Sequence, residues 1–558
     1  MGKRLILVFV GILCFFVLII IRLFFWQVAN IEKLRGIAEN QTNTFLTIPA
    51  KRGEILATDG SPLVMNKRAY LVYLEPHKIE NKDKTVEILA KELGLPSASI
   101  SAKLKETELR WLPIAQKIDE EAVAKIKKFG LPGIGFIEES KRYYPEGSMS
   151  AHLLGFVGKN AKGEDQGYSG LEGYYEEQLH GRNGYLKQET DARGNPILSG
   201  NLEEVQPEDG RDLVLTIDKT VQFIAEKKLL EGIEKYGAKG GTVAIMDPYS
   251  GSLLASASYP SYDPGDFLKY PSQYYINPVV ASSYEPGSTF KVLVMAAALN
   301  EGKVKPDTKI NEDGPITIGE YTINTWNQKY HGEISLNQIL EYSSNVGMVL
   351  VQKQLGSDLL LKYLNNLGFG RLTDIDLEGE NSPLLRSKSN WYEIDYASAS
   401  FGQGIAVTPL QMVRAVGAIA NGGRLMKPYV VKSIKDKNNR VINISEKTER
   451  EVYKKEATTL LTEMMVSAVD NGETRLIKPQ GYKIAGKTGT AQIAIAGHYD
   501  AEKTIASFVG FAPVRKPKFV MLVTIQEPTA SPWGSETAAP VFFSIAKELF
   551  SYYGISPD

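Results

Sequence analysis

An apolar run from Leu5 to Trp26, in which Arg22 is the only charged residue, restricts how the whole chain can fold. As a helix its ~22 residues extend for about 33 Å, enough to cross the hydrocarbon core of a bilayer. A cleaved signal peptide is the alternative, but the run is long for one, and Gln27-Val28-Ala29-Asn30 offers no small-x-small cleavage site. Lys3 and Arg4 predict a cytoplasmic N-terminus. We therefore expect one membrane-spanning helix and a large body folded outside the membrane.

Composition narrows the chemistry of that body. The whole chain has 558 residues, which predicts two or three domains, and its hydrophobic content of 43% with 23% charged residues is typical of folded proteins. The only cysteine, Cys14, lies inside the apolar run, so the body holds no disulfide and no cysteine–metal site. The five histidines show no ligand spacing, so we expect neither a metal nor another cofactor. The net charge of −1 does not indicate a nucleic-acid partner.

The strongest candidate for a nucleophile is Ser288. Pro286 and Gly287 precede it, and an Ala-, Leu- and Met-rich stretch after Lys291 predicts a buried helix that starts near the serine. Lys291 follows one helical turn later, so its amine can reach the Ser288 hydroxyl. Burial lowers the pKa of a lysine, which can then take the serine proton, and a helix N-terminus favours the resulting negative charge. This arrangement suits acyl transfer.

The spacing Ser-x-x-Lys is not specific by itself. A second copy, Ser544-Ile545-Ala546-Lys547, lies among phenylalanines and leucine in a predicted helix with no helix start beside its serine. We interpret that copy as a packed serine and a lysine whose stem lies along an apolar surface.

The rest of the chain suggests a platform followed by a mixed α/β domain. Residues 83–104 and 119–129 predict amphipathic helices, and the acidic stretch 201–210 predicts a domain boundary. Beyond it we expect a helix capped by Asp218, a hairpin over 242–256 and a mostly helical block to about residue 422. Three strands follow, and then a final helix, with these ranges: 482–493, 505–512, 519–525 and 538–552. This order predicts an antiparallel sheet with helices on both sides.

Two further motifs accompany Ser288. Ser343-Ser344-Asn345 lies in the helical block, although Ser-x-Asn also occurs at 199–201 and 335–337. Lys487-Thr488-Gly489-Thr490 lies on the first late strand, and Lys-Thr-Gly occurs only there. Its lysine and threonine can offer a charge and a hydroxyl to a carboxylate, and its glycine can admit a substrate backbone. Alone, the glycine would more often mark a bulge or close packing.

In this order, Ser-x-x-Lys, Ser-x-Asn and Lys-Thr-Gly form the motif set of penicillin-binding proteins and serine β-lactamases. Over nearly its whole length the chain resembles the class B, single-activity penicillin-binding proteins of the division or sporulation type. The other matching stretches are Arg52-Gly53, Arg142-Tyr143-Tyr144-Pro145, Gly170-Leu171-Glu172-Gly173, Tyr284-Glu285-Pro286-Gly287, Gly402-Gln403-Gly404-Ile405, Thr408-Pro409-Leu410-Gln411 and Ser507-Phe508-Val509-Gly510.

The resemblance implies a multidomain fold. Residues 1–28 would form a cytoplasmic stub and transmembrane anchor, and 29–210 an α+β pedestal, similar to a dimerisation domain, without catalytic residues. Residues 211–558 would form a transpeptidase domain like the serine β-lactamases, with a five-stranded antiparallel sheet between helices. The resemblance assigns catalysis to Ser288, Lys291, Ser343 and Asn345, and substrate binding to Lys487, Thr488, Gly489 and Thr490.

The implied reaction cross-links peptidoglycan stem peptides that end in D-Ala-D-Ala, in septal wall synthesis. Ser288 would attack the penultimate D-alanine carbonyl with Lys291 as base, and the backbone N–H groups of Ser288 and Thr490 would form the oxyanion hole. β-Lactam antibiotics would acylate the same serine. The implied location is the bacterial cell membrane, and the implied partners are a polytopic membrane glycan polymerase and division proteins.

Three other readings use the same motifs. A β-lactamase or D,D-carboxypeptidase needs neither the anchor nor a platform of roughly 180 residues. A β-lactam sensor acylates the same serine but generally needs a signalling membrane region. A bifunctional synthase needs a glycosyltransferase domain, and residues 31–210 show no acidic catalytic pair.

Overall fold

The computed structural model describes residues 2–34, 43–105, 111–189, 202–438, 440–495 and 498–557. The predicted N-terminal helix is present as α1 (Gly2–Phe24), which continues into a short π-helical turn, Phe25–Ala29. No residue of α1 is buried by the protein. In the described part of the chain this is the one helix long and apolar enough to cross a membrane.

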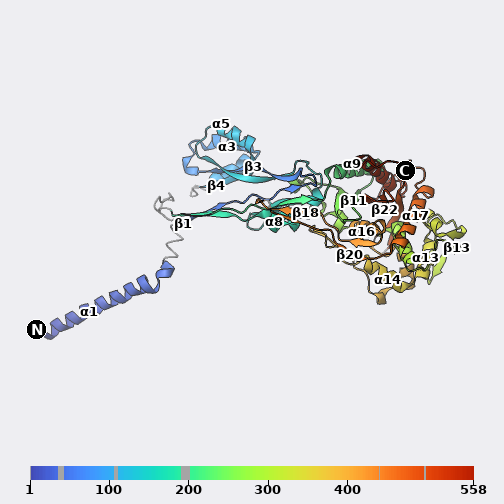
Figure 1. The fold of residues 1–558 in the computed structure, drawn as a ribbon. Coiled ribbons are helices and arrows are strands. Elements are labelled where there is room, and N and C mark those ends of the chain that lie inside the picture. Colours follow the sequence, from blue (N-terminus) through green and yellow to red (C-terminus); the bar gives the residue numbers. More distant parts are fainter. Residues whose placement is uncertain are drawn as a thin grey trace. The chain divides into compact units, whose positions relative to one another are not determined.

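The chain divides into two compact units (Figure 1). The first consists of residues 1–52 and 180–210. Beyond α1, it contains a three-stranded antiparallel sheet in the order β1-β8-β9. These strands are β1 (Asn43–Ile48), β8 (Gly184–Glu189) and β9 (Leu202–Val205). The second unit, residues 53–179 and 211–558, contains everything described below.

A seven-stranded sheet in the second unit joins parts of the chain that are far apart in sequence. Its order is β19-β18-β10-β2-β3-β4, and β5 also pairs with β3. The strands are β2 (Ile55–Leu56), β3 (Pro62–Leu74), β4 (Leu112–Asp119), β5 (Ile134–Tyr143), β10 (Asp212–Leu215), β18 (Val431–Lys435) and β19 (Val441–Asn443). Strands that are far apart in the sequence therefore form one sheet.

Three helices share an apolar core with β3, β4 and β5, namely α3 (Lys82–Leu93), α4 (Ser97–Leu104) and α5 (Glu120–Lys128). The helix expected over 119–129 is confirmed as α5. The single helix expected over 83–104 is wrong, because the structure has two helices there. Gly94 takes a left-handed conformation (φ 65°) that ends α3, and Pro96 directly precedes α4.

The second sheet is five-stranded and antiparallel, as predicted, in the order β12-β11-β23-β22-β21. Its strands are β11 (Gly240–Met246), β12 (Leu253–Tyr259), β21 (Ala485–Ile495), β22 (His498–Ala512) and β23 (Phe519–Gln526). Side chains of β23 alternate between two hydrophobic clusters: Leu522 belongs to one, and Met521 and Val523 to the other. Alternation along a strand places the two clusters on opposite faces of the sheet.

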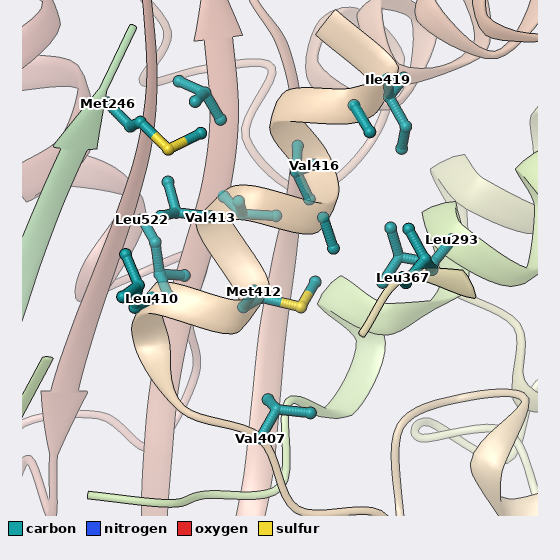
Figure 2. Close-up of a cluster of buried hydrophobic side chains, with 14 of the residues drawn as sticks. Met246, Leu293, Leu367, Val407, Leu410, Met412, Val413, Val416, Ile419 and Leu522 are labelled. Carbon is teal, nitrogen blue, oxygen red and sulfur yellow. The ribbon is translucent and has the colours of Figure 1, made fainter. Parts of the chain in front are cut away.

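Helices cover both faces. On one face lie α9 (Lys219–Tyr236) and α18 (Ala538–Tyr552), and on the other lie α11 (Lys291–Asn300) and α16 (Pro409–Ala420). Figure 2 shows α16 between Met246 and Leu522 on its sheet side and Leu293 and Leu367 on its outer side. The helix α11, which carries Leu293, thus packs on the side of α16 that faces away from the sheet.

Several local predictions are confirmed. The Asp218 carboxylate caps α9 by accepting from the Thr220 and Val221 N–H groups, the hairpin over 242–256 is β11–β12, and α18 has the predicted bounds. The block expected to be mostly helical also contains two small two-stranded antiparallel sheets that were not predicted. They pair β13 (Lys309–Glu312) with β16 (Gly332–Ser335), and β14 (Ile316–Ile318) with β15 (Tyr321–Ile323).

The remaining elements are short or connect those above. They are α6 (Ala151–Leu154), β6 (Phe156–Lys159), β7 (Asp165–Tyr168), α7 (Gly170–Tyr174), α8 (Glu176–His180), α10 (Pro278–Ala281), α12 (Leu336–Glu341), α13 (Asn345–Leu355), α14 (Ser357–Asn366), α15 (Glu393–Ala399), β17 (Arg424–Met426), β20 (Thr448–Glu451) and α17 (Lys455–Asn471).

Candidate active site

Ser288 lies in a tight helical turn, Gly287–Phe290, that runs directly into α11. The predicted position at a helix start is confirmed. Gly287 has φ +55°, and a Cβ on it would lie 3.0 Å from the Thr490 carbonyl oxygen, so glycine suits this turn sterically and conformationally. The Gly287 N–H donates to the Gly402 carbonyl (3.0 Å). The serine itself is half-buried and faces a cleft.

Lys291 is fully buried as the first residue of α11. Its Nζ donates to the Ser343 carbonyl oxygen (2.6 Å) and to Asn345 Oδ1 (2.8 Å), and lies 3.4 Å from Ser343 Oγ. Burial, followed by repulsion from Lys487, holds the pKa of Lys291 well below its usual value. The amine therefore tends toward its neutral, basic form beside the Ser-x-Asn motif.

The Ser-x-Asn motif forms the connection between α12 and α13. Ser343 adopts an uncommon positive φ of 54°, which turns its carbonyl and hydroxyl toward Lys291. Ser344 caps α13, where its hydroxyl accepts from the Gly347 N–H and donates to the buried Glu312 carboxylate. Asn345 begins α13 and donates its amide N–H to the Asn324 carbonyl (3.1 Å). Both ends of the asparagine amide are therefore held.

The Lys-Thr-Gly motif lies on β21, the edge strand of the five-stranded sheet. Lys487 Nζ is buried and donates to Thr488 Oγ1 (3.0 Å), and Thr488 Oγ1 donates to Glu473 Oε2 (2.8 Å). Burial lowers the pKa of Lys487, and attraction to Glu473 opposes that shift. Two residues along, Thr490 Oγ1 accepts from the Gly534 N–H (3.0 Å).

Gly489 allows β21 to pack against the turn that holds Ser288. A Cβ at this position would lie 2.5 Å from Ser507 Oγ, 2.8 Å from Thr289 Cγ2 and 3.0 Å from the Pro286 carbonyl oxygen. Close packing thus explains the glycine at this position, which was one of the two structural interpretations of it in the sequence. The part it plays in binding substrate stays a prediction.

One cleft brings the predicted residues together. Ser288, Ser343, Asn345, Thr488, Gly489 and Thr490 line it, while Lys291 and Lys487 are buried behind its wall. Five other side chains line the cleft, and none of them had a predicted role: Trp326, Phe401, Gln403, Glu473 and Trp533. Trp326 and Trp533 meet edge to face, with ring centroids 5.2 Å apart. Only Gln403 had a signal in the sequence, as part of a family stretch.

The second Ser-x-x-Lys copy lies within α18, where Ser544 is half-buried and Lys547 is exposed. That agrees with its interpretation as a packing pattern. Among the residues that the structure describes, no cluster of His, Cys, Asp or Glu could hold a metal ion.

Comparisons with known proteins cover both halves of the body. A family model described as the penicillin binding protein transpeptidase domain matches residues 241–547. A second, described as the penicillin-binding protein dimerisation domain, matches residues 47–215.

Similar proteins span almost the entire chain. Stage V sporulation protein D of Bacillus subtilis is 35% identical over 563 residues, which cover 100% of this chain and 86% of the relative. Peptidoglycan D,D-transpeptidase FtsI of Escherichia coli is 30% identical and covers 92% of this chain and 85% of its own length. Among solved structures, penicillin binding protein 2X of Streptococcus thermophilus superposes with a TM-score of 0.76 at 26% identity, covering 91% of this chain and 80% of that one. A peptidoglycan synthetase of Bifidobacterium adolescentis gives a TM-score of 0.74 at 28% identity, with 92% and 98% covered.

Proposed function

Because the chain belongs to the class B penicillin-binding proteins, the peptidoglycan D,D-transpeptidases of the division and sporulation type, we propose that Ser288 is its nucleophile and Lys291 its general base. One observation carries this assignment. The Lys291 amine is buried one helical turn from Ser288, with a strongly lowered pKa and with hydrogen bonds that aim it at the Ser-x-Asn motif. A neutral amine in that position is the base that an unactivated serine hydroxyl needs.

In the first half of the reaction, Ser288 Oγ attacks the carbonyl carbon of the penultimate D-alanine and its proton passes to Lys291. The N–H groups of Ser288 and Thr490 donate hydrogen bonds to the tetrahedral oxyanion. The close packing of Gly489 against Pro286 and Thr289 supports this, because it brings the two segments together. The C–N bond then breaks. The terminal D-alanine leaves with a proton relayed from Lys291 through Ser343, and Ser288 remains acylated.

In the second half, an amine from a neighbouring strand attacks the ester carbonyl, and the bond between that carbon and Ser288 Oγ breaks. Its proton returns through Ser343 and Lys291 to Ser288 Oγ, and a new peptide bond is the cross-link. Asn345 holds the donor's amide, since its own amide is fixed between Lys291 and Asn324. Lys487 and Thr488 hold the donor's terminal carboxylate as a cation and a hydroxyl. Gly489 and Thr490 complete this binding edge.

We also propose an orientation and a set of partners. Lys3 and Arg4 favour a cytoplasmic N-terminus, which puts the catalytic body outside the membrane. We place the anchor at 1–28, the pedestal at 29–210 and the transpeptidase domain at 211–558. A transpeptidase needs nascent glycan beside its cleft, so a polytopic membrane glycan polymerase, with division proteins, is the partner we assign to the anchor and pedestal.

Covalent labelling tests the nucleophile. The full-length protein is incubated with penicillin, digested and examined by mass spectrometry for the acylated residue. Ser288→Ala is expected to lose all labelling, and Ser544→Ala, the matched control in the second Ser-x-x-Lys copy, to label normally. Labelling that survives in Ser288→Ala would overturn the assignment.

A further inference from the structure

The Thr488 hydroxyl is already engaged by the protein itself. It accepts from Lys487 Nζ (3.0 Å) and donates to Glu473 Oε2 (2.8 Å). A hydroxyl has one proton to donate. In this structure the proton of Thr488 goes to the carboxylate of Glu473. To bind the carboxylate of a donor peptide, Thr488 would need the same proton.

The backbone on both sides of Glu473 is fixed, so the residue is held beside the cleft. Gly472 directly follows α17, and a Cβ on it would lie 2.3 Å from the Ala468 carbonyl oxygen and 2.9 Å from that of Glu341. On the other side Thr474 is buried, and its hydroxyl donates to the Val469 carbonyl (3.2 Å). The Glu473 side chain, by contrast, is exposed and lines the cleft.

Glu473 also acts electrostatically on the lysines of the site. Its negative charge raises the pKa of Lys487 and of Lys291 against the lowering effect of burial. A carboxylate in this position resembles, in charge and hydrogen bonding, the terminal carboxylate of a stem peptide and the carboxylate of a penicillin. Two carboxylates cannot both accept the one proton of the Thr488 hydroxyl, and two negative charges side by side repel each other.

We propose that Glu473 is an internal competitor for the carboxylate subsite of the cleft. Its side chain occupies the hydrogen-bonding position on Thr488 and swings into solvent when the carboxylate of a donor peptide or a β-lactam arrives. This inference rests on the proposed role of Lys487 and Thr488 in binding that carboxylate. It makes Glu473 a residue that weakens capture of anionic donors without contacting the reacting carbonyl.

The test compares a penicillin with its methyl ester, which lacks the carboxylate, in acylation of the full-length protein. Glu473→Gln keeps the shape of the side chain and its acceptor oxygen but removes the charge. We expect the second-order acylation rate for the acid to rise by about 3- to 30-fold, and the rate for the ester to change by less than about twofold. Glu536→Gln is the matched control, because Glu536 is an exposed carboxylate that is absent from the lining of the cleft. It should alter neither rate.

The other outcomes are distinguishable. Equal changes for acid and ester would mean a structural role, and a selective fall for the acid would mean that Glu473 assists carboxylate binding. Either of these outcomes would overturn the inference, and so would unchanged rates for both compounds. Glu473→Asp keeps the charge but shortens the reach to Thr488, so its ratio should fall between wild type and Glu473→Gln. If the wild-type protein itself does not distinguish acid from ester, the proposed role of Lys487 and Thr488 fails instead.

Discussion

We expect the burial of the Lys291 amine to set the pH range in which the enzyme is acylated. The charged groups that act on it are Lys487, which lowers its pKa further, and Glu473 and Glu312, which raise it. Only the neutral amine accepts a proton, so the acylation rate should rise as pH increases through the lowered pKa and then level off. The midpoint should lie well below the value of about 10.4 for a free lysine.

Stopped-flow acylation by penicillin across the neutral and basic range measures this midpoint. Lys291→Arg should reduce the rate by about 10²–10⁴-fold, the usual contribution of a general base, because a guanidinium stays protonated. Lys547→Arg, in the second Ser-x-x-Lys copy, should behave like wild type. A midpoint at the free-lysine value would contradict the role of Lys291.

The structure brings together the residues that the sequence predicted for the site. Ser288, Lys291, Ser343 and Lys487 could be named because each belongs to a motif with its own chemistry. Glu473 could not, because it lies in a connection after α17, and its contact with Thr488 exists only once that helix end packs beside β21. The charged and aromatic residues that tertiary packing brings to a cleft leave no local pattern in the sequence.

Among the elements, β5 and α7 are joined by a buried ion pair. Arg142 Nε lies 2.6 Å from Glu172 Oε1, with side chains 6% and 0% exposed, and Arg142 also donates to Asn66 Oδ1. Two of the stretches that resemble the family thus meet in one contact. Arg142→Ala removes charge-assisted hydrogen bonds from a buried position, and their loss costs more than the loss of an exposed pair.

We expect Arg142→Ala to lower the free energy of unfolding by about 1.5–3 kcal/mol. Arg68→Ala is the matched control: its partner is Glu138, both side chains are more than half exposed, and the loss should be at most about 1 kcal/mol. Urea unfolding followed by circular dichroism, with the full-length protein in detergent, gives both values. Equal losses in the two variants would show that the Arg142–Glu172 pair does not stabilise the fold.

Element type followed from the sequence more reliably than element boundaries. Strong periodicity and clear end signals predicted α9, α18 and the β11–β12 hairpin. The two-stranded sheets β13–β16 and β14–β15 were missed because strands of three or four residues are too short to show an alternating pattern. The fold class, with its apolar N-terminal helix, pedestal and transpeptidase domain, is confirmed by the family matches.

For the whole molecule, the absence of a visible glycan-forming site in the sequence of residues 31–210 predicts dependence on a partner. In vesicles with lipid-linked precursor, the full-length protein alone should form no glycan polymer. Addition of a membrane glycan polymerase should give cross-linked product, which penicillin should reduce to uncross-linked strands. Analysis of muramidase digests separates the two products. Polymer made by this chain alone would show that the pedestal has an activity of its own.

The seven-stranded sheet also imposes an order on biosynthesis. Its strand β10 (Asp212–Leu215) has the short β2 as one neighbour and β18 (Val431–Lys435) as the other, and β18 in turn carries β19. At about 5–20 residues per second, a ribosome adds β18 on the order of 10–40 s after β10. During that interval β10 exposes an unpaired edge. The newly made chain therefore passes through a period in which one side of β10 can pair with the wrong strand.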